Sequence, residues 1–190
     1  MRGLVDEGRH VLDTTAARWP DNDRTKIERF FAALEVDDMD GALALVANPD
    51  TRPFTISAAH AMIWRAALQA RKTRDAQAMR RAAVAAWRDA DPSVIWITSA
   101  FSLCALLDDL DCAFAEADRW AADPVGGDFG LLFSPVTRSV RRDPRFMALA
   151  ARLGLVDYWR ATGHWPDFCS EPSLPYDCKV EAAKLAAKHG

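Results

Sequence analysis

The stretch Asp-Asp-Met-Asp-Gly-Ala at residues 37–42 reappears as Asp-Asp-Leu-Asp-Cys-Ala at residues 108–113, and this recurrence decides the fold. Each copy lies between two runs whose apolar residues recur at helical spacing. Ahead of the first copy these residues are Ile27, Phe30, Phe31 and Leu34. Aspartate caps the helix that follows it, so each copy predicts a tight turn between two antiparallel helices.

Other landmarks repeat with nearly the same period. The recurring pairs are Trp64 and Trp96, Trp87 and Trp120, and the Asp-Pro steps at 91–92 and 123–124, spaced by 32, 33 and 32 residues. A fixed period of this length indicates stacked helical hairpins. We therefore expect the four tryptophans to pack between hairpins rather than to bind a ligand.

This period, with a tryptophan in the first helix and a proline at the end of each unit, resembles the tetratricopeptide repeat. Trp64 with Pro92, and Trp96 with Pro124, match the family pattern, whereas Arg71 departs from it, because the family usually has tyrosine there. The resemblance implies an all-α fold, a right-handed superhelix of antiparallel helical hairpins.

The predicted organisation is a single domain over residues 1–190. Its parts are a leading helix at 3–18, hairpins at 25–49, 57–92 and 93–124, and an atypical closing and capping segment at 125–190. Thr25 followed by Glu28 predicts a capping box at the start of the first hairpin. Asp143 before Pro144 predicts the start of another helix.

The closing segment carries a second resemblance. The runs at 143–146, 153–159 and 165–169 are similar to the end of tetratricopeptide arrays in bacterial winged-helix regulators and adenylate-cyclase-like proteins. In those proteins the array is a sensory or partner-binding part, so the resemblance implies a regulatory module.

Four cysteines fall in two pairs. Cys169 and Cys178 flank a loop rich in turn residues, and they form either a disulfide or two reduced thiols packed against neighbouring aromatic side chains. Cys104 and Cys112 lie on apolar helical faces, where small core residues are expected. The alanine-rich end of the chain predicts a helix that caps the array.

Composition excludes several classes of function. Charged residues make up 27% of the 190 and the net charge is −3, so this chain alone has no electrostatic reason to bind nucleic acid. No stretch is apolar enough to enter a membrane, and the first residues lack a secretory apolar core, so we expect a cytoplasmic protein. The four histidines show no metal-ligand spacing, and no cofactor motif is present.

Charge differs between neighbouring repeats. Residues 59–92 hold seven Lys or Arg against three Asp, a balance of +4, whereas residues 93–124 hold one Arg against six acids, a balance of −5. The family's first helices line a concave groove, which by resemblance would expose Arg65, Gln69, Lys72, Thr98 and Ser102. We expect a non-enzymatic scaffold that binds a protein or peptide with acidic groups there.

Two alternatives stay open at this point. One is a self-associating regulatory module, a homo-oligomer that meets its copy through the groove or through residues 129–140. The other is an enzyme that uses His164 with Cys169 and Cys178, which are close in sequence but lack a recognised catalytic spacing.

Overall fold

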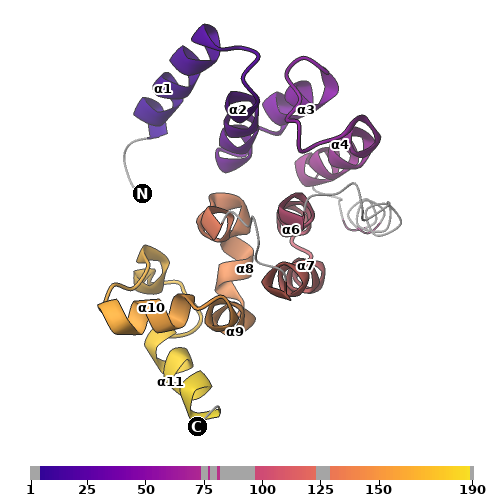
Figure 1. Cartoon of the computed structure of the whole chain (residues 1–190). Coiled ribbons are helices and arrows are strands. Elements are labelled where there is room, and N and C mark those ends of the chain that lie inside the picture. The colour runs from indigo at the N-terminus through magenta and orange to yellow at the C-terminus, as the bar shows by residue number, and fades with distance from the viewer. Residues whose placement is uncertain (1–4, 74–76, 78–80, 82–96, 123–128, 189–190) are drawn as a thin grey trace. The chain divides into compact units, whose positions relative to one another are not determined.

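The chain is helical throughout the part that the computed structural model describes, which is residues 5–73, 77, 81, 97–122 and 129–188 (Figure 1). No β-strand occurs among those residues, which confirms the predicted all-α class for them. The chain divides into two compact units, Met1–Ser99 and Ala100–Gly190. The single superhelix over residues 1–190 stays a prediction. Within the described ranges, no helix has the length and apolar character that a membrane span requires.

The first unit begins with three helices in the places that the repeat analysis expected and continues with a fourth. They are α1 (Val5–Arg18), α2 (Asp23–Glu35), α3 (Met39–Ala47) and α4 (Ala58–Lys72). The second half of the predicted hairpin at 57–92, including Trp87, lies outside the described residues.

The start of α2 differs from the prediction. The side chain of Asn22 caps this helix, because its Oδ1 accepts a hydrogen bond from the Thr25 backbone N–H at 3.1 Å. The predicted capping box of Thr25 and Glu28 is wrong: the helix starts two residues earlier, and asparagine caps as well as threonine does. Glu28 instead pairs with Arg24 one turn away, at 2.7 Å.

The core of the first unit forms between α2, α3 and α4. Phe30, Val46, Trp64 and Leu68 are buried. The rings of Phe30 and Trp64 meet edge to face with centroids 5.1 Å apart, a favourable geometry for aromatic pairs. The predicted core position of Trp64 is confirmed, whereas Trp96 lies outside the described residues.

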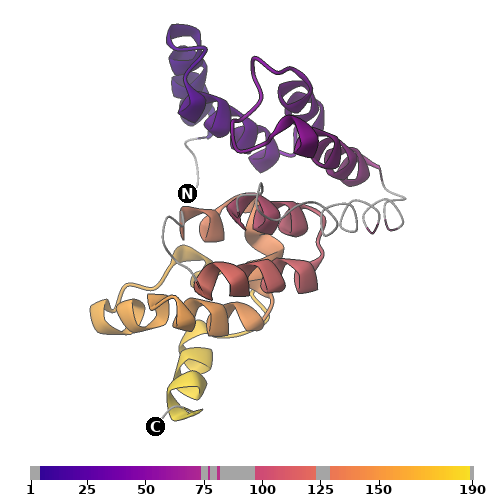
Figure 2. The same ribbon diagram turned by 45° about the vertical axis from the view of Figure 1, so that its right-hand side comes forward.

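The second unit holds the remaining helices. They are α6 (Ile97–Leu106, which starts just before the unit boundary), α7 (Leu110–Ala122), the short 3-10 helices η2 (Phe129–Phe133) and η3 (Pro135–Thr137), α8 (Arg138–Arg142), α9 (Arg145–Arg152), α10 (Leu155–Thr162), η4 (Asp167–Ser170) and α11 (Cys178–Lys188). α9 lies between α7 and α10 in Figure 1, and Figure 2 shows α11 on the side of α9 away from α7.

The repeated aspartate motif adopts the same corner twice. Asp37 and Asp108 both take the left-handed backbone conformation, with φ of 59° and 55°. The next aspartate then caps the following helix: Asp38 accepts from the Gly41 N–H, and Asp109 accepts from the Cys112 N–H, each at 2.9 Å. The recurrence in the sequence is therefore a recurrence in structure, and capping explains these aspartates.

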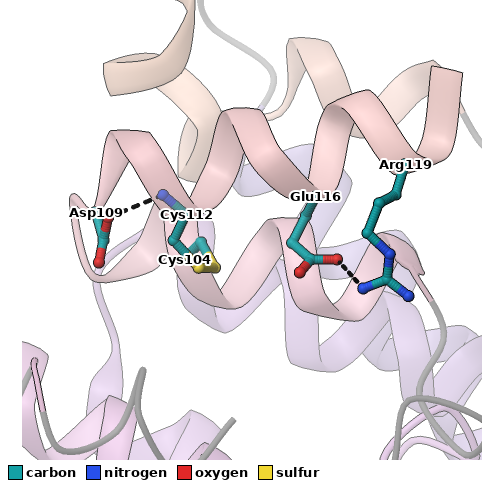
Figure 3. Close-up of a disulfide and its surroundings, with 5 residues drawn as sticks. All are labelled: Cys104, Asp109, Cys112, Glu116 and Arg119. Carbon is teal, nitrogen blue, oxygen red and sulfur yellow. Dashed lines mark hydrogen bonds and ion pairs between the residues drawn. A yellow bond between two sulfur atoms is a disulfide. The ribbon is translucent and has the colours of Figure 1, made fainter. Parts of the chain in front are cut away.

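Cys104 and Cys112 lie across the second corner (Figure 3). Both are buried, as expected for small core residues, and the structure also joins them in a disulfide that the sequence analysis did not predict. The corner brings the last turn of α6 against the first turn of α7, with the two Cα atoms 5.6 Å apart. This separation is within the range that disulfides span.

Residues 129–140, a predicted self-association surface, supply core side chains to their own unit. Leu132 and Val140 are fully buried, and the ring of Phe133 lies 6.4 Å from that of Trp159. The buried guanidinium of Arg141 donates from one nitrogen to the carbonyls of Leu132 and Ser134. Burial lowers the pKa of Arg141 from its usual value.

The loop between Cys169 and Cys178 is held from two directions. A disulfide joins its ends, with Cα atoms 5.7 Å apart. From α8, Arg138 pairs with Glu171 at 3.3 Å and Arg142 donates to the Ser173 hydroxyl at 2.8 Å. The hydroxyl of Tyr176 donates to the Arg141 carbonyl, and burial raises the pKa of Tyr176. An irregular segment is thereby fixed at the start of α11.

Candidate functional site

The exposed face of α4 forms a hollow with α3. Met62, Arg65, Ala66 and Gln69 fall at i, i+3, i+4 and i+7 along α4, and Leu43 of α3 completes a depression of about 380 Å³. Met62 is 73% exposed, the most exposed of the large apolar side chains in the described residues. An apolar side chain this open beside a cation makes a surface suited to binding.

The hollow exists because the opposite face of α4 belongs to the core. That face carries His60, Trp64 and Leu68, which are buried. Ser57 caps the helix and also shares a hydrogen bond with the His60 ring, 2.9 Å between Oγ and Nδ1. With its apolar face fixed against α2 and α3, α4 leaves Arg65 and Gln69 directed outward.

The predicted site residues in the first unit differ in their electrostatic state. Lys72 donates to Asp40 with 2.6 Å between Nζ and Oδ1, so its charge is already compensated. Arg65 and Gln69 have no side-chain partner within the part of the chain that the structure describes. Of the two cations in the expected groove, Arg65 is therefore the one available to a ligand.

The structure describes the side chain of only one of the other two predicted groove residues. The side chain of Thr98 lies outside what the structure describes. Ser102 belongs to the second unit and is only 1% exposed, so the expectation that it lines an open groove is wrong. Its neighbours Phe101 and Leu103 are buried as well, so α6 is enclosed on all sides from residue 100 to residue 106.

A larger hollow lies in the second unit, over α9. Its volume is about 670 Å³, and four helices line it. The lining residues are Phe114 and Asp118 of α7, Arg145, Ala148, Ala151 and Arg152 of α9, Val156, Asp157 and Arg160 of α10, and Ala182, Leu185 and Ala186 of α11. We name this depression the α9 groove. It was not predicted from the sequence.

Ion pairs fix one side of the α9 groove. Arg145 bonds to Asp111 at 2.7 Å and to Asp143 at 2.8 Å, and its guanidinium lies 4.4 Å from the centre of the Phe114 ring. Arg152, seven residues on, pairs with Asp118, seven residues after Asp111. The two ion pairs occur in the same order and at the same spacing along both helices, so α7 and α9 run parallel.

These pairs also set the charge state of the groove wall. The hydrogen bonds from Arg145 lower the pKa of Asp143, and both aspartates raise the pKa of Arg145. The separation of 34 residues within each ion pair is close to the repeat period. The repeat period was therefore the feature of the sequence that could have indicated the contact between α7 and α9.

The region around His164 offers little for the enzyme alternative. The sulfurs of Cys169 and Cys178 are bonded to each other, so neither is a thiolate that can attack a substrate or bind a metal. His164 is exposed. Among the described residues, no three His, Cys, Asp or Glu side chains converge in a way that holds a metal ion.

No protein-family model, no curated protein and no solved structure matches this chain.

Proposed function

We propose that this chain is a non-enzymatic interaction module whose α4 face binds an acidic peptide segment of a partner protein. The observation that carries the proposal is the guanidinium of Arg65, which has no partner among the residues that the structure describes and lines one hollow with the exposed Met62 and with Gln69. A cation, an amide and an apolar surface together recognise a carboxylate that adjoins an apolar side chain.

Each lining residue has a distinct role in the proposed complex. The planar guanidinium of Arg65 takes a carboxylate through two parallel N–H donors, and such a bond contributes about 1.5–3 kcal/mol. Gln69, one turn away, donates to or accepts from the peptide backbone. Met62 and Leu43 receive the apolar side chain next to the acid, and the flexible thioether of methionine adapts to different partners.

The scaffold of the proposal is a stack of hairpins of the tetratricopeptide type. The identical corners at Asp37 and Asp108, and the two ion pairs that each span 34 residues, support a repeated unit. In a repeat stack each hairpin buries its apolar faces against its neighbours. The remaining exposed helix faces, such as that of α4, are then the surfaces on which specificity resides.

The test uses an array of ten-residue peptides in which Asp or Glu adjoins Leu, Ile or Met. Each peptide is also made with the acid replaced by its amide, and binding is measured by fluorescence anisotropy. We expect acidic peptides to bind the unmodified protein, with the amide versions at least about tenfold weaker, as the loss of one charge-assisted bond requires.

Two variants locate the site. Arg65→Glu reverses the charge of the hollow without breaking a contact, so circular dichroism is unchanged while affinity falls at least about tenfold. Lys26→Glu makes the same change of charge on α2, away from the hollow, and is expected to bind as the unmodified protein does. Equal binding by Arg65→Glu, or no binding by any peptide at about 1 mM, contradicts the proposal.

A further inference from the structure

The floor of the α9 groove consists of side chains that end at the β-carbon. α9 contributes Ala148 and Ala151, and α11 contributes Ala182 and Ala186. Ala148 and Ala186 are exposed, so no residue of the described chain covers them. The distance between packed helices decreases with the size of the side chains between them, and an alanine floor therefore admits one more helix at close approach.

The length of the groove suits a short helical segment. It follows α9 from Arg145, its first residue, to Arg152, its last. Eight residues at 1.5 Å each give about 12 Å, or about two turns of a guest helix. Leu185 of α11 is half-buried and presents apolar surface that a guest's leucine-type side chains would contact, whereas Phe114 and Val156, which also line the groove, are buried.

The walls favour a helix over an extended peptide. All four lining elements are helices, whose backbone N–H and C=O groups are already bonded within each helix. An extended guest would have to find partners for its own backbone N–H and C=O groups among the charged side chains of the groove and water. A helical guest satisfies its backbone internally and presents only side chains.

Charge selects between possible guests. Three arginines and two aspartates line the groove, which leaves it with a balance of +1. Arg145 and Arg152 have partners inside the unit, whereas Arg160 has none among the described residues. Arg152 pairs through one nitrogen and keeps further N–H donors. Acidic flanks on the guest therefore complement the rim better than basic ones.

From these observations we infer that the α9 groove is a second binding site, which takes an amphipathic helix of a partner protein. The guest carries an apolar ridge against Ala148 and Ala151 and a flanking acid for Arg160. The site is distinct from the α4 hollow, because it belongs to the other unit.

The probe is a 14-residue peptide with leucines at helical spacing and glutamate on both flanks, together with a counterpart that has lysine at every flank. Binding to the full chain is measured by fluorescence anisotropy and by the gain of helical circular dichroism. We expect the glutamate peptide to bind and the lysine peptide to bind at least about tenfold more weakly.

Matched variants place the peptide in the groove. Ala148→Trp fills the floor from an exposed position and is expected to weaken binding at least about tenfold, whereas Ala183→Trp adds the same bulk outside the groove and leaves the affinity unchanged. Arg160→Glu tests the charge without adding volume. It is expected to weaken the binding of the glutamate peptide but not that of the lysine peptide. Arg65→Glu leaves this binding unaffected, which separates it from the α4 site.

Three results overturn the inference. The first is that neither peptide binds, and the second is that Ala148→Trp and Ala183→Trp bind equally well. The third is a concentration-dependent dimer, seen by mass in solution, that Ala148→Trp abolishes. That outcome would place a second copy of this chain in the groove instead of a partner protein.

Discussion

Removing the disulfide between Cys169 and Cys178 should destabilise the second unit by an amount that its loop length sets. The bond closes a loop with a sequence separation of 9 residues. In the chain-entropy description, opening a loop of this size costs about 2.6 kcal/mol at 25 °C, because the unfolded chain gains freedom that the bond denies it. We expect the variant Cys169→Ala with Cys178→Ala to lose about this free energy of unfolding.

The assay is urea unfolding followed by circular dichroism, on the unmodified protein and the double variant, each with and without a reducing agent. The unmodified protein should lose more stability on reduction than the variant does, because the variant retains only the Cys104–Cys112 bond. For a unit of this size, a loss of about 2.6 kcal/mol lowers the melting temperature by roughly 10–20 °C.

One result refutes this reasoning. If the variant unfolds within about 0.5 kcal/mol of the unmodified protein, the loop is ordered by its contacts with α8 rather than by the disulfide. Those contacts are the Arg138–Glu171 pair, the Arg142–Ser173 hydrogen bond and the bond from Tyr176 to the Arg141 carbonyl. Removing the Tyr176 hydroxyl by Tyr176→Phe would then be the more damaging change.

Three further predictions concern the backbone, acid stability and redox state. Gly154 has a φ of 74°, so Gly154→Ala should cost about 1 kcal/mol in thermal unfolding, whereas Gly8→Ala, within α1, should stabilise by about 0.5–1 kcal/mol. The lowered pKa of Asp143 contributes stability that is present above the unfolded value near pH 4 and is lost as pH falls through the folded pKa. Asp143→Asn should therefore flatten the acid side of the stability profile measured by denaturant unfolding. Thiol titration of the denatured, unreduced protein should detect no free cysteine, whereas four reactive thiols would agree with the expected cytoplasmic compartment.

The helical fold was predictable because local signals agree with the tertiary structure. The aspartate corners at 37–42 and 108–113 carry their own capping chemistry, which depends only on residues three positions apart. Trp64 and Trp120 each belong to a pair of tryptophans spaced at the repeat period, and both are buried. Where two local caps competed, as with Asn22 and Thr25, the sequence did not decide between them.

The candidate site was less predictable, because it depends on contacts between helices far apart in the sequence. Ser102 has a polar side chain, and only the packing of α6 reveals that it is buried. The α9 groove needs α7, α9, α10 and α11 in place at once. Alanine is common in ordinary helices, so nothing in the sequence distinguished the alanines of this groove from the other alanines of the chain.

Under the proposed function, what recurs between the two units is scaffold, and what does not recur carries recognition. In each unit the third aspartate of the corner, Asp40 or Asp111, accepts an ion pair from a later helix, Lys72 in one case and Arg145 in the other. Because these two cations form ion pairs with the aspartates of the repeated corner, they are less available to a ligand. Arg65 and Arg160 have no counterpart in the repeat and no partner among the described residues, and each borders a hollow. A repeat scaffold that binds through its unpaired cations should therefore tolerate exchange of its corners but not charge reversal at these two arginines.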